Sequence, residues 1–254
     1  MDKHIFTFWE PQTNIPEYLK LCMQTWEKFL PEYKIIVLDY KNIDKWLEKD
    51  FFDKTLYKYY SLPQQADAIR CALLEKYGGI WLDTDTIITS EKIKDLLDID
   101  SDFILFGDHI GFIKAKKHTY ILQQWLKGIK RNLTIYKYFR FLKKILKLKE
   151  WDYLGNKILA PLLMTEDKNT YYEIDKYKNN IFPELKIFCD IPHYDAYQKF
   201  YFESDYSQYV TDNTGGIILL HNSWTPPQYK NLSKQEILNT NNTISKLLKN
   251  ILNY

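Results

Sequence analysis

Asp83 and Asp85 stand two residues apart, directly after the apolar run Ile80-Trp81-Leu82. Carboxylates at the end of a buried strand cost free energy unless a cation binds them. Their hard oxygen atoms suit Mn²⁺ or Mg²⁺. Such an ion usually keeps coordination positions open for substrate phosphates. The pattern therefore predicts a divalent metal that bridges a diphosphate and offsets its charge as the diphosphate leaves.

A second charged pair, Asp67 and Arg70, lies three residues apart on a predicted helix just upstream. Residues with this spacing share one face of a helix. Two interpretations stay open from the sequence. The pair is either an exposed ion pair of small energetic value, or part of the same site as the two later aspartates.

The segments around these residues alternate between strand and helix. The predicted elements are strands at 4–9, 34–39 and 80–82, and helices at 18–30, 42–49 and 63–77. Gly78-Gly79 is expected to cap the last of these helices. This order predicts an α/β fold with a mostly parallel, Rossmann-like sheet flanked by helices. Ligands bind beyond the carboxyl ends of such strands, where Trp9, Asp39 and Asp83 stand.

The second half of the chain is less regular and predicts a helical insertion. Its predicted elements are strands at 103–106, 111–114 and 216–220, and helices at 119–129, 136–149, 233–239 and 243–252. We expect one domain over residues 1–254. It is expected to have three parts, at residues 4–120, 121–210 and 211–254.

Composition narrows the class of protein. The 254 residues carry a net charge of +2, which does not favour nucleic acid as a partner. The three cysteines, Cys22, Cys71 and Cys189, lack the spacing of a zinc site or disulfide framework. The start of the chain lacks a signal-peptide pattern, and no run of 18 apolar residues predicts a membrane span. The expected location is the cytoplasm.

Three motifs together resemble a known family. Residues 65–86 (QADAIRCALLEKYGGIWLDTDT) resemble the DXD-containing sugar-binding region of glycosyltransferase family 32. The opening strand 4–9, ending in Trp, and the late motif His221-Asn222-Ser223-Trp224 are also similar to that family. It includes bacterial capsule and lipooligosaccharide transferases, yeast initiating mannosyltransferases and the catalytic domains of clostridial glucosylating toxins. The resemblance implies a GT-A fold and retention of the anomeric configuration.

The resemblance also implies roles for matching residues. Trp9 would stack on the nucleotide base, although a Trp at a strand end is also compatible with the core. Asp67 and Arg70 would hold the donor sugar and its diphosphate. Asp83 would contact ribose, sugar or metal, and Asp85 would bind the metal directly.

The late motif carries the remaining candidates. His221 would be a third metal ligand as a neutral imidazole, or else a core histidine. Ser223 and Trp224 would close over the diphosphate, and Asp39 is grouped with the nucleotide-binding residues. The compact spacing leaves open whether His221, Asn222 or Ser223 touches the metal.

Together with the resemblance, which implies retention, these features predict a retaining glycosyltransferase. Within it, residues 4–120 would bind the nucleotide sugar and metal, residues 121–210 would face the acceptor or membrane, and residues 211–254 would close the fold. The enzyme would move a sugar, most simply from a UDP-sugar, to a glycan or lipid-linked glycan in surface polysaccharide or lipooligosaccharide synthesis. One alternative is a metal-dependent nucleotide-sugar hydrolase. Another is an inactive carbohydrate-binding or assembly protein on the same fold.

The segment 136–149 (YKYFRFLKKILKLK) interleaves six cations with bulky apolar residues. A basic amphipathic helix of this kind lies on anionic membranes. The same pattern is compatible with a surface helix that packs its apolar face inward. Peripheral contact with the inner face of the cytoplasmic membrane is therefore one expectation.

Overall fold

The computed structural model describes residues 3–54, 60–106, 109–138, 152–163, 194–204 and 210–254. Its contacts divide the chain into two compact units. One comprises Met1–Glu10, Ile36–Trp81 and Ser101–Phe182, and the other comprises Pro11–Ile35, Leu82–Asp100 and Pro183–Tyr254. The expectation of one domain with three sequential parts stays a prediction.

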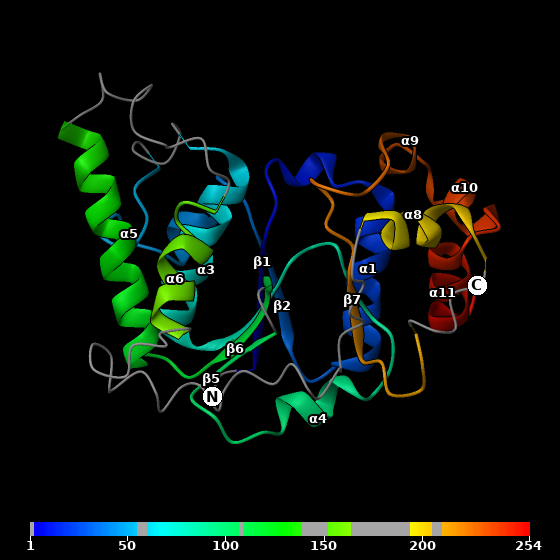
Figure 1. The fold of residues 1–254 in the computed structure, drawn as a ribbon, viewed down its shortest axis with the longest axis horizontal. Coiled ribbons are helices and arrows are strands. Elements are labelled where there is room, and N and C mark those ends of the chain that lie inside the picture. Colours follow the sequence, from blue (N-terminus) through cyan, green and yellow to red (C-terminus); the bar gives the residue numbers. More distant parts are fainter. Residues whose placement is uncertain (1–2, 55–59, 107–108, 139–151, 164–193, 205–209) are drawn as a thin grey trace. The chain divides into compact units, whose positions relative to one another are not determined.

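The first unit is built on a five-stranded sheet in the order β2-β1-β3-β6-β5 (Figure 1). The strands are β1 (His4–Phe8), β2 (Lys34–Leu38), β3 (Gly79–Leu82), β5 (Phe103–Phe106) and β6 (His109–Ala115). β1 and β3 run parallel, whereas β5 and β6 form an antiparallel pair. The amide of Trp9 donates to the carbonyl of Leu38, so β1 and β2 end at the same edge. The predicted mixed α/β architecture, with a mostly parallel sheet flanked by helices, is confirmed.

Local sequence explains the central helix of this unit, α3 (Leu62–Tyr77). Pro63 stands in its first turn, where a missing amide costs nothing. Gly78 ends it with a φ of 68° and an amide that donates to Leu74. A Cβ at Gly78 would lie 2.8 Å from the amide nitrogen of Lys117, so this cap needs glycine for space as well as for φ.

Two further helices complete the first unit. α5 (Tyr120–Tyr138) packs on α3, and α6 (Asn156–Leu163) packs on α5. The Cys71 thiol of α3 contacts the carbonyl of Leu122, and the indole of the fully buried Trp125 donates to the carbonyl of Leu154. The prediction that Cys71 is a small core residue is confirmed.

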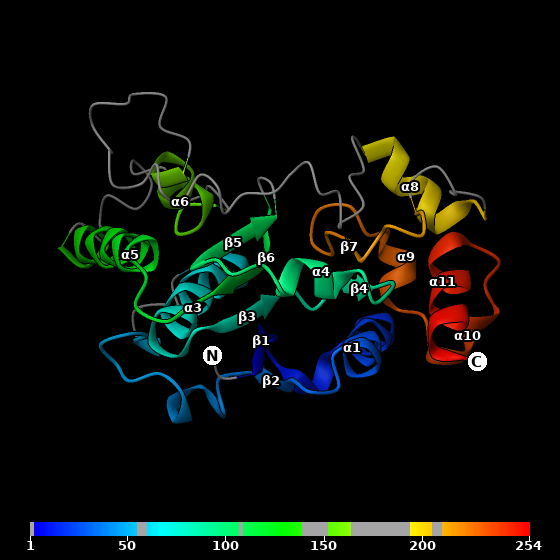
Figure 2. The same ribbon diagram turned by 90° about the horizontal axis from the view of Figure 1, so that it is seen from below.

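The second unit contains a short antiparallel ribbon of β4 (Thr86–Ile88) and β7 (Gly216–Ile218). α1 (Glu17–Phe29) packs on β4, and Trp26 donates its indole N–H to the carbonyl of Thr86. The other helices are α4 (Ile93–Leu97), α8 (Tyr194–Phe202), α9 (Pro227–Lys230), α10 (Lys234–Asn239) and α11 (Thr243–Leu252). α11 packs against α1, α8 and α10 (Figure 2).

Several boundaries differ from the sequence-based expectation. The helix expected at 42–49 is a single 3₁₀ turn, η2 (Ile43–Lys45), because the segment is anchored by turn contacts of Asp39 and Asn42. The strand expected at 216–220 ends at Ile218, since Leu220 adopts a φ of 51°, which breaks an extended strand. β4, α4, α6, α8 and α9 were not predicted.

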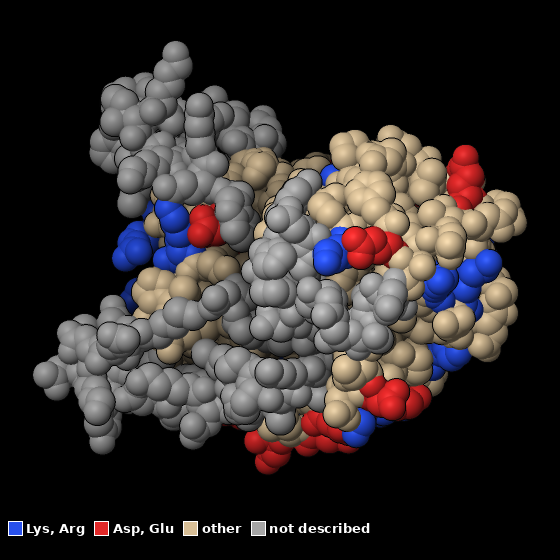
Figure 3. All heavy atoms as spheres, turned by 45° about the vertical axis from the view of Figure 1, so that its right-hand side comes forward, with Lys and Arg blue, Asp and Glu red and all other residues tan. Residues whose placement is uncertain are grey.

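The basic segment 136–149 continues α5 as far as Tyr138, and residues 139–149 lie outside the described part of the chain. Its membrane role stays a prediction. Among the described helices, none combines the length and the apolar character needed to span a bilayer. On the face in Figure 3, lysines and arginines lie among acidic residues where the surface is described.

Candidate active site

Asp67 and Arg70 form a buried pair on α3, with 5% and 3% of their surfaces exposed. Arg70 Nη1 lies 3.4 Å from Asp67 Oδ1. The interpretation of the pair as an exposed surface contact is therefore wrong. Helical spacing correctly predicted that the two residues share one face of α3. That face is buried because α3 packs against β1 and α5.

Arg70 is also placed over an aromatic ring. Its guanidinium carbon lies 4.8 Å from the ring centre of Trp81, in the range of a cation–π contact. Burying an ion pair brings little net stability, because desolvation of both charges offsets their attraction. Burial of the pair therefore does not by itself indicate a large contribution to stability, and its contact with a donor stays a prediction.

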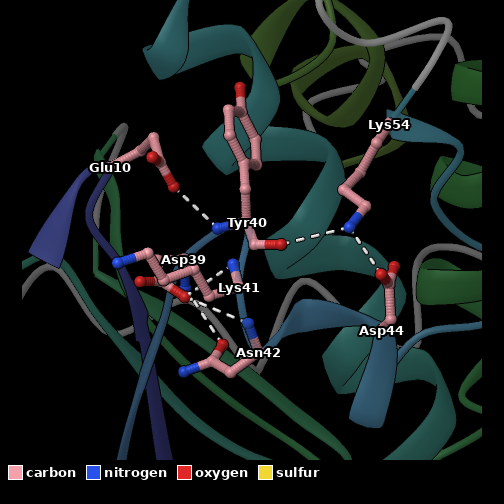
Figure 4. Close-up of polar contacts among 7 residues, drawn as sticks. All are labelled: Glu10, Asp39, Tyr40, Lys41, Asn42, Asp44 and Lys54. Carbon is pink, nitrogen blue, oxygen red and sulfur yellow. Dashed lines mark hydrogen bonds and ion pairs between the residues drawn. The ribbon is translucent and has the colours of Figure 1, made fainter.

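The loop after β2 holds Asp39 in a turn (Figure 4). Asp39 Oδ1 accepts hydrogen bonds from the amides of Lys41 (2.9 Å) and Asn42 (3.0 Å). The Asp39 amide in turn donates to Oδ1 of Asn42, and Nδ2 of Asn42 donates to the carbonyl of Val37. One carboxylate oxygen of Asp39 is therefore engaged in shaping the loop, and its contact with a nucleotide stays a prediction.

Glu10 and Tyr40 connect the ends of β1 and β2. The amide of Tyr40 donates to Glu10 Oε2 at 2.6 Å (Figure 4), and the Tyr40 hydroxyl donates to Oε1 of Gln65 on α3. Lys54 Nζ donates to the Tyr40 carbonyl at 3.1 Å and pairs with Asp44. The sequence analysis did not predict these hydrogen bonds, because the residues that form them are distant in the chain and match no motif.

Trp9 directly follows β1 and is partly exposed, whereas Trp26, Trp81 and Trp125 are fully buried. Trp9 is therefore less buried than these three tryptophans, which does not decide between the core and the base-stacking interpretations. Its stacking on a base stays a prediction.

Asp85 anchors the corresponding group in the second unit. It is 6% exposed and stands one residue before β4. Its Oδ2 accepts a hydrogen bond from the amide of His221, and its carbonyl accepts one from the amide of Leu219 at 3.0 Å. The β4–β7 pairing thus brings the second aspartate of the motif next to His221, 136 residues later.

The His221 ring is held by Tyr18 of α1. A hydrogen bond joins the Tyr18 hydroxyl to Nδ1, and the two rings stack with centres 5.8 Å apart. Burial, with a smaller contribution from Lys230, lowers the pKa of His221 to about 4. Burial also raises the pKa of Tyr18 far above its usual range. The imidazole is therefore neutral at ordinary pH, and Tyr18 is a contributor that the sequence did not indicate.

The other residues of both motifs line turns. The carbonyl of Asp83 accepts a bond from the amide of Thr86, and Asp83 is partly exposed while Thr84 is buried. The amides of Ser223 and Trp224 both donate to the carbonyl of Leu220. Ser223 is exposed and Trp224 partly exposed, and their contacts with a diphosphate stay predictions.

The donor set of this unit is compatible with a divalent cation. Asp83 and Asp85 supply hard oxygen atoms, and Mg²⁺-type ions are commonly held by one or two carboxylates plus substrate phosphates. Within the described ranges, no group of three or more His, Cys, Asp or Glu side chains is arranged around a metal position. A contact from His221 would use Nε2, because Nδ1 faces Tyr18.

The predicted residues thus form two groups. In the first unit, α3 and the strand ends carry Trp9, Asp39, Asp67 and Arg70. In the second unit, the segments beside β4 and β7 carry Asp83, Asp85, His221, Ser223 and Trp224.

Comparison with family models gives a match over nearly the whole chain. A family model described as capsular polysaccharide synthesis protein matches residues 1–248. The resemblance to glycosyltransferase family 32 itself stays a prediction.

Individual relatives match over shorter stretches. The lactosylceramide 4-alpha-galactosyltransferase of Rattus norvegicus is 41% identical over 64 residues, 24% of this chain and 17% of that protein. The O-glycosyltransferase braB of Annulohypoxylon truncatum is 25% identical over 158 residues, 51% of this chain and 37% of that protein. The chain therefore spans well under two thirds of these relatives. The solved PaToxG glycosyltransferase is 17% identical, with a TM-score of 0.43 over 71% of this chain and 78% of that chain.

Proposed function

The chain belongs to the capsular polysaccharide synthesis protein family, and from that premise we propose that it is a glycosyltransferase. It transfers a sugar from a nucleotide-sugar donor, a UDP-sugar in the first instance, to a glycan acceptor. The names of the two partly matching relatives, a galactosyltransferase and an O-glycosyltransferase, support this class of reaction.

The observation that carries the proposal is the placement of Asp85. Its carboxylate is buried and fixed by the amide of His221, beside a neutral imidazole. A main-chain amide is a neutral donor, so it orients the carboxylate without cancelling its charge. The partly exposed Asp83, two residues earlier, adds a second carboxylate. This combination suits a Mn²⁺ or Mg²⁺ ion that offsets charge on a departing diphosphate.

The residues of the chain have separate roles in this proposal. Asp67 and Arg70 bind the donor sugar and its diphosphate, and Trp9 stacks on the base. Tyr18 fixes the orientation of His221, and Ser223 and Trp224 cover the diphosphate. Stabilising a leaving group by preoriented charges and dipoles is a large contribution to catalysis of this kind.

We further propose retention of the anomeric configuration. The acceptor hydroxyl attacks the face that the diphosphate leaves, the bond from the anomeric carbon to the diphosphate breaks, and the leaving diphosphate takes the hydroxyl proton. The α linkage in the name of the partly matching galactosyltransferase supports this outcome. The acceptor is a glycan, free or lipid-linked, of a capsule or a lipooligosaccharide, and the reaction takes place in the cytoplasm, with peripheral membrane contact through residues 136–149.

A panel of nucleotide sugars tests the proposal. Purified protein is incubated with each donor and Mn²⁺, with and without excess EDTA, and release of the nucleoside diphosphate is measured. We expect one donor to react, EDTA to abolish the reaction and Mn²⁺ to restore it. Full activity in excess EDTA would contradict the metal assignment.

Addition of candidate acceptors separates transfer from hydrolysis. A transferase forms a glycoside and releases diphosphate faster with the acceptor present, whereas a hydrolase does neither. Proton NMR of the anomeric coupling in the product then decides stereochemistry. A β-linked product from a UDP-α-sugar would overturn the retaining assignment and leave transfer itself intact.

A further inference from the structure

Gly155 lies directly against the Asp67 carboxylate in the first unit. A Cβ at Gly155 would stand 2.3 Å from Oδ2 of Asp67 and 2.7 Å from its Cγ. It would also stand 2.8 Å from Cδ1 of Ile110. Protein interiors do not accommodate such approaches, so any side chain at position 155 must displace Asp67 or the backbone that faces it.

The need for glycine at this position is one of space. The glycines with positive φ among the described residues are Gly78 and Gly79, so Gly155 adopts a conformation open to other residues. If no atoms were nearby, alanine at such a position would stabilise the protein slightly by restricting the unfolded chain. Because a Cβ at position 155 would collide with Asp67, we expect alanine to destabilise the protein instead.

The backbone on which Gly155 sits is fixed from the opposite side. The buried indole of Trp125 on α5 donates to the carbonyl of Leu154 at 2.7 Å. The carbonyl of Gly155 accepts from the amides of Ile158 and Leu159, so the residue stands at the start of α6. The segment therefore cannot retreat easily from a larger side chain at 155.

The two oxygens of Asp67 are thus held from two sides. Oδ1 faces the Arg70 guanidinium at 3.4 Å, and Oδ2 packs against Gly155. Sequence reasoning had found no motif in this part of the chain.

We propose that Gly155 is a positioning residue for the donor site: it makes the room in which the Asp67 carboxylate takes its donor-binding orientation. The proposal rests on the proposed function, which assigns Asp67 to the donor. It adds that the absence of a side chain at position 155 determines how tightly the donor is held.

Gly155→Ala tests the proposal, with Gly128→Ala as the matched control. A Cβ at Gly128 would stand 2.5 Å from Cγ2 of Ile158, so this control disturbs packing of α5 on α6 without touching Asp67. Asp67→Ala removes the bulk that meets position 155, and Asp67→Asn keeps the bulk and removes the charge.

Thermal melting of these variants tests the contact without any ligand. We expect Gly155→Ala to lower the Tm in the wild-type and Asp67→Asn backgrounds, and to lower it much less in the Asp67→Ala background. Such non-additivity is the signature of two residues in direct contact. An equal decrease in all three backgrounds would overturn the proposal.

Donor kinetics test the functional half, using the nucleotide sugar that the wild type turns over in the panel above. Misplacement of a binding group by about 1 Å can cost on the order of a hundredfold. We expect Gly155→Ala to lower kcat/KM by roughly 10- to 100-fold, mainly through a higher KM. A change that only destabilised the fold would lower kcat through loss of active protein and leave KM unchanged, as we expect for Gly128→Ala.

The double variant Asp67→Ala/Gly155→Ala should be no worse than Asp67→Ala alone. A further tenfold loss, or a wild-type KM in Gly155→Ala, would overturn the positioning role. A wild-type KM in Asp67→Ala is a different result, because it removes Asp67 from the donor site and so contradicts the proposed function. In that case, the melting cycle still decides the contact.

Discussion

The two buried aspartates of the candidate site are held in different ways. Asp67 in the first unit faces a guanidinium that is itself placed over Trp81. Asp85 in the second unit is fixed by a main-chain amide and lies beside a histidine that burial keeps neutral. The charge of Asp67 is therefore balanced by the positive charge of Arg70. The carboxylate of Asp85 is oriented by a main-chain amide, which carries a dipole but no net charge.

This difference predicts different consequences of substitution. An ion pair buried beneath the sheet makes each partner necessary for the other, because a lone buried charge is costly. A carboxylate oriented by a neutral amide keeps its full charge for a ligand, so its loss should affect chemistry more than folding. We therefore expect substitutions in the first group to affect stability more than substitutions in the second group.

The largest expected effect is on stability, in the first unit. Arg70→Ala leaves Asp67 buried and unbalanced, and we expect it to lower the free energy of unfolding by about 3–5 kcal/mol. Urea denaturation measures the change. Asp67→Leu/Arg70→Met, which replaces both charges by apolar groups, is the matched control and should recover most of the loss. A cost below about 1 kcal/mol for Arg70→Ala would show that the pair is solvated in solution.

The next effect is on turnover, in the second unit. Asp85→Asn keeps an acceptor for the His221 amide but removes the charge, so we expect stability within about 1 kcal/mol of wild type. Metal-dependent turnover of the donor should fall on the order of a hundredfold or more, as for loss of a central electrostatic stabiliser. Asp95→Asn, which removes an exposed carboxylate of α4 paired with Lys92, is the control and should keep full activity. Comparable activity in both variants would exclude Asp85 from the chemistry.

The smallest effect is a pH dependence from His221. Its pKa of about 4 in the folded protein lies below the usual value of 6.5, so the unfolded chain binds more protons between these values. Stability should therefore be fully present above about pH 6.5 and decline as the pH falls toward 4. Urea unfolding at several pH values in EDTA measures this slope. His221→Gln should have a shallower slope in that window, and an unchanged slope would assign it to other groups.

Much of the first unit follows from local patterns. Helical spacing, Pro63 and Gly78 predict α3 to within one residue, and the apolar run before Asp83 predicts β3. These elements depend on neighbouring residues in the chain, whose preferences can be read directly. The same reasoning missed β4, because its three residues merge with the preceding motif, and it extended β7 through Leu220.

The contacts of the candidate site required the tertiary structure. The motif at residues 65–86 indicated four site residues by type and spacing alone, namely Asp67, Arg70, Asp83 and Asp85. It did not indicate that Asp67 and Arg70 are buried, because one helical face can point to solvent or to the core.

The sequence by itself determined the succession β1, α1, β2, α3 and β3, the capped end of α3 and the placement of two aspartates after a buried strand. The pairing of β4 with β7 decided that Asp85 meets His221, and the packing of α6 decided that Gly155 meets Asp67. The physical reason is the range of the interactions. Helix periodicity and capping act over a few residues and can be predicted from local sequence. Strand pairing and steric contact join residues far apart in the chain, and nothing in the local sequence indicates which residues will meet.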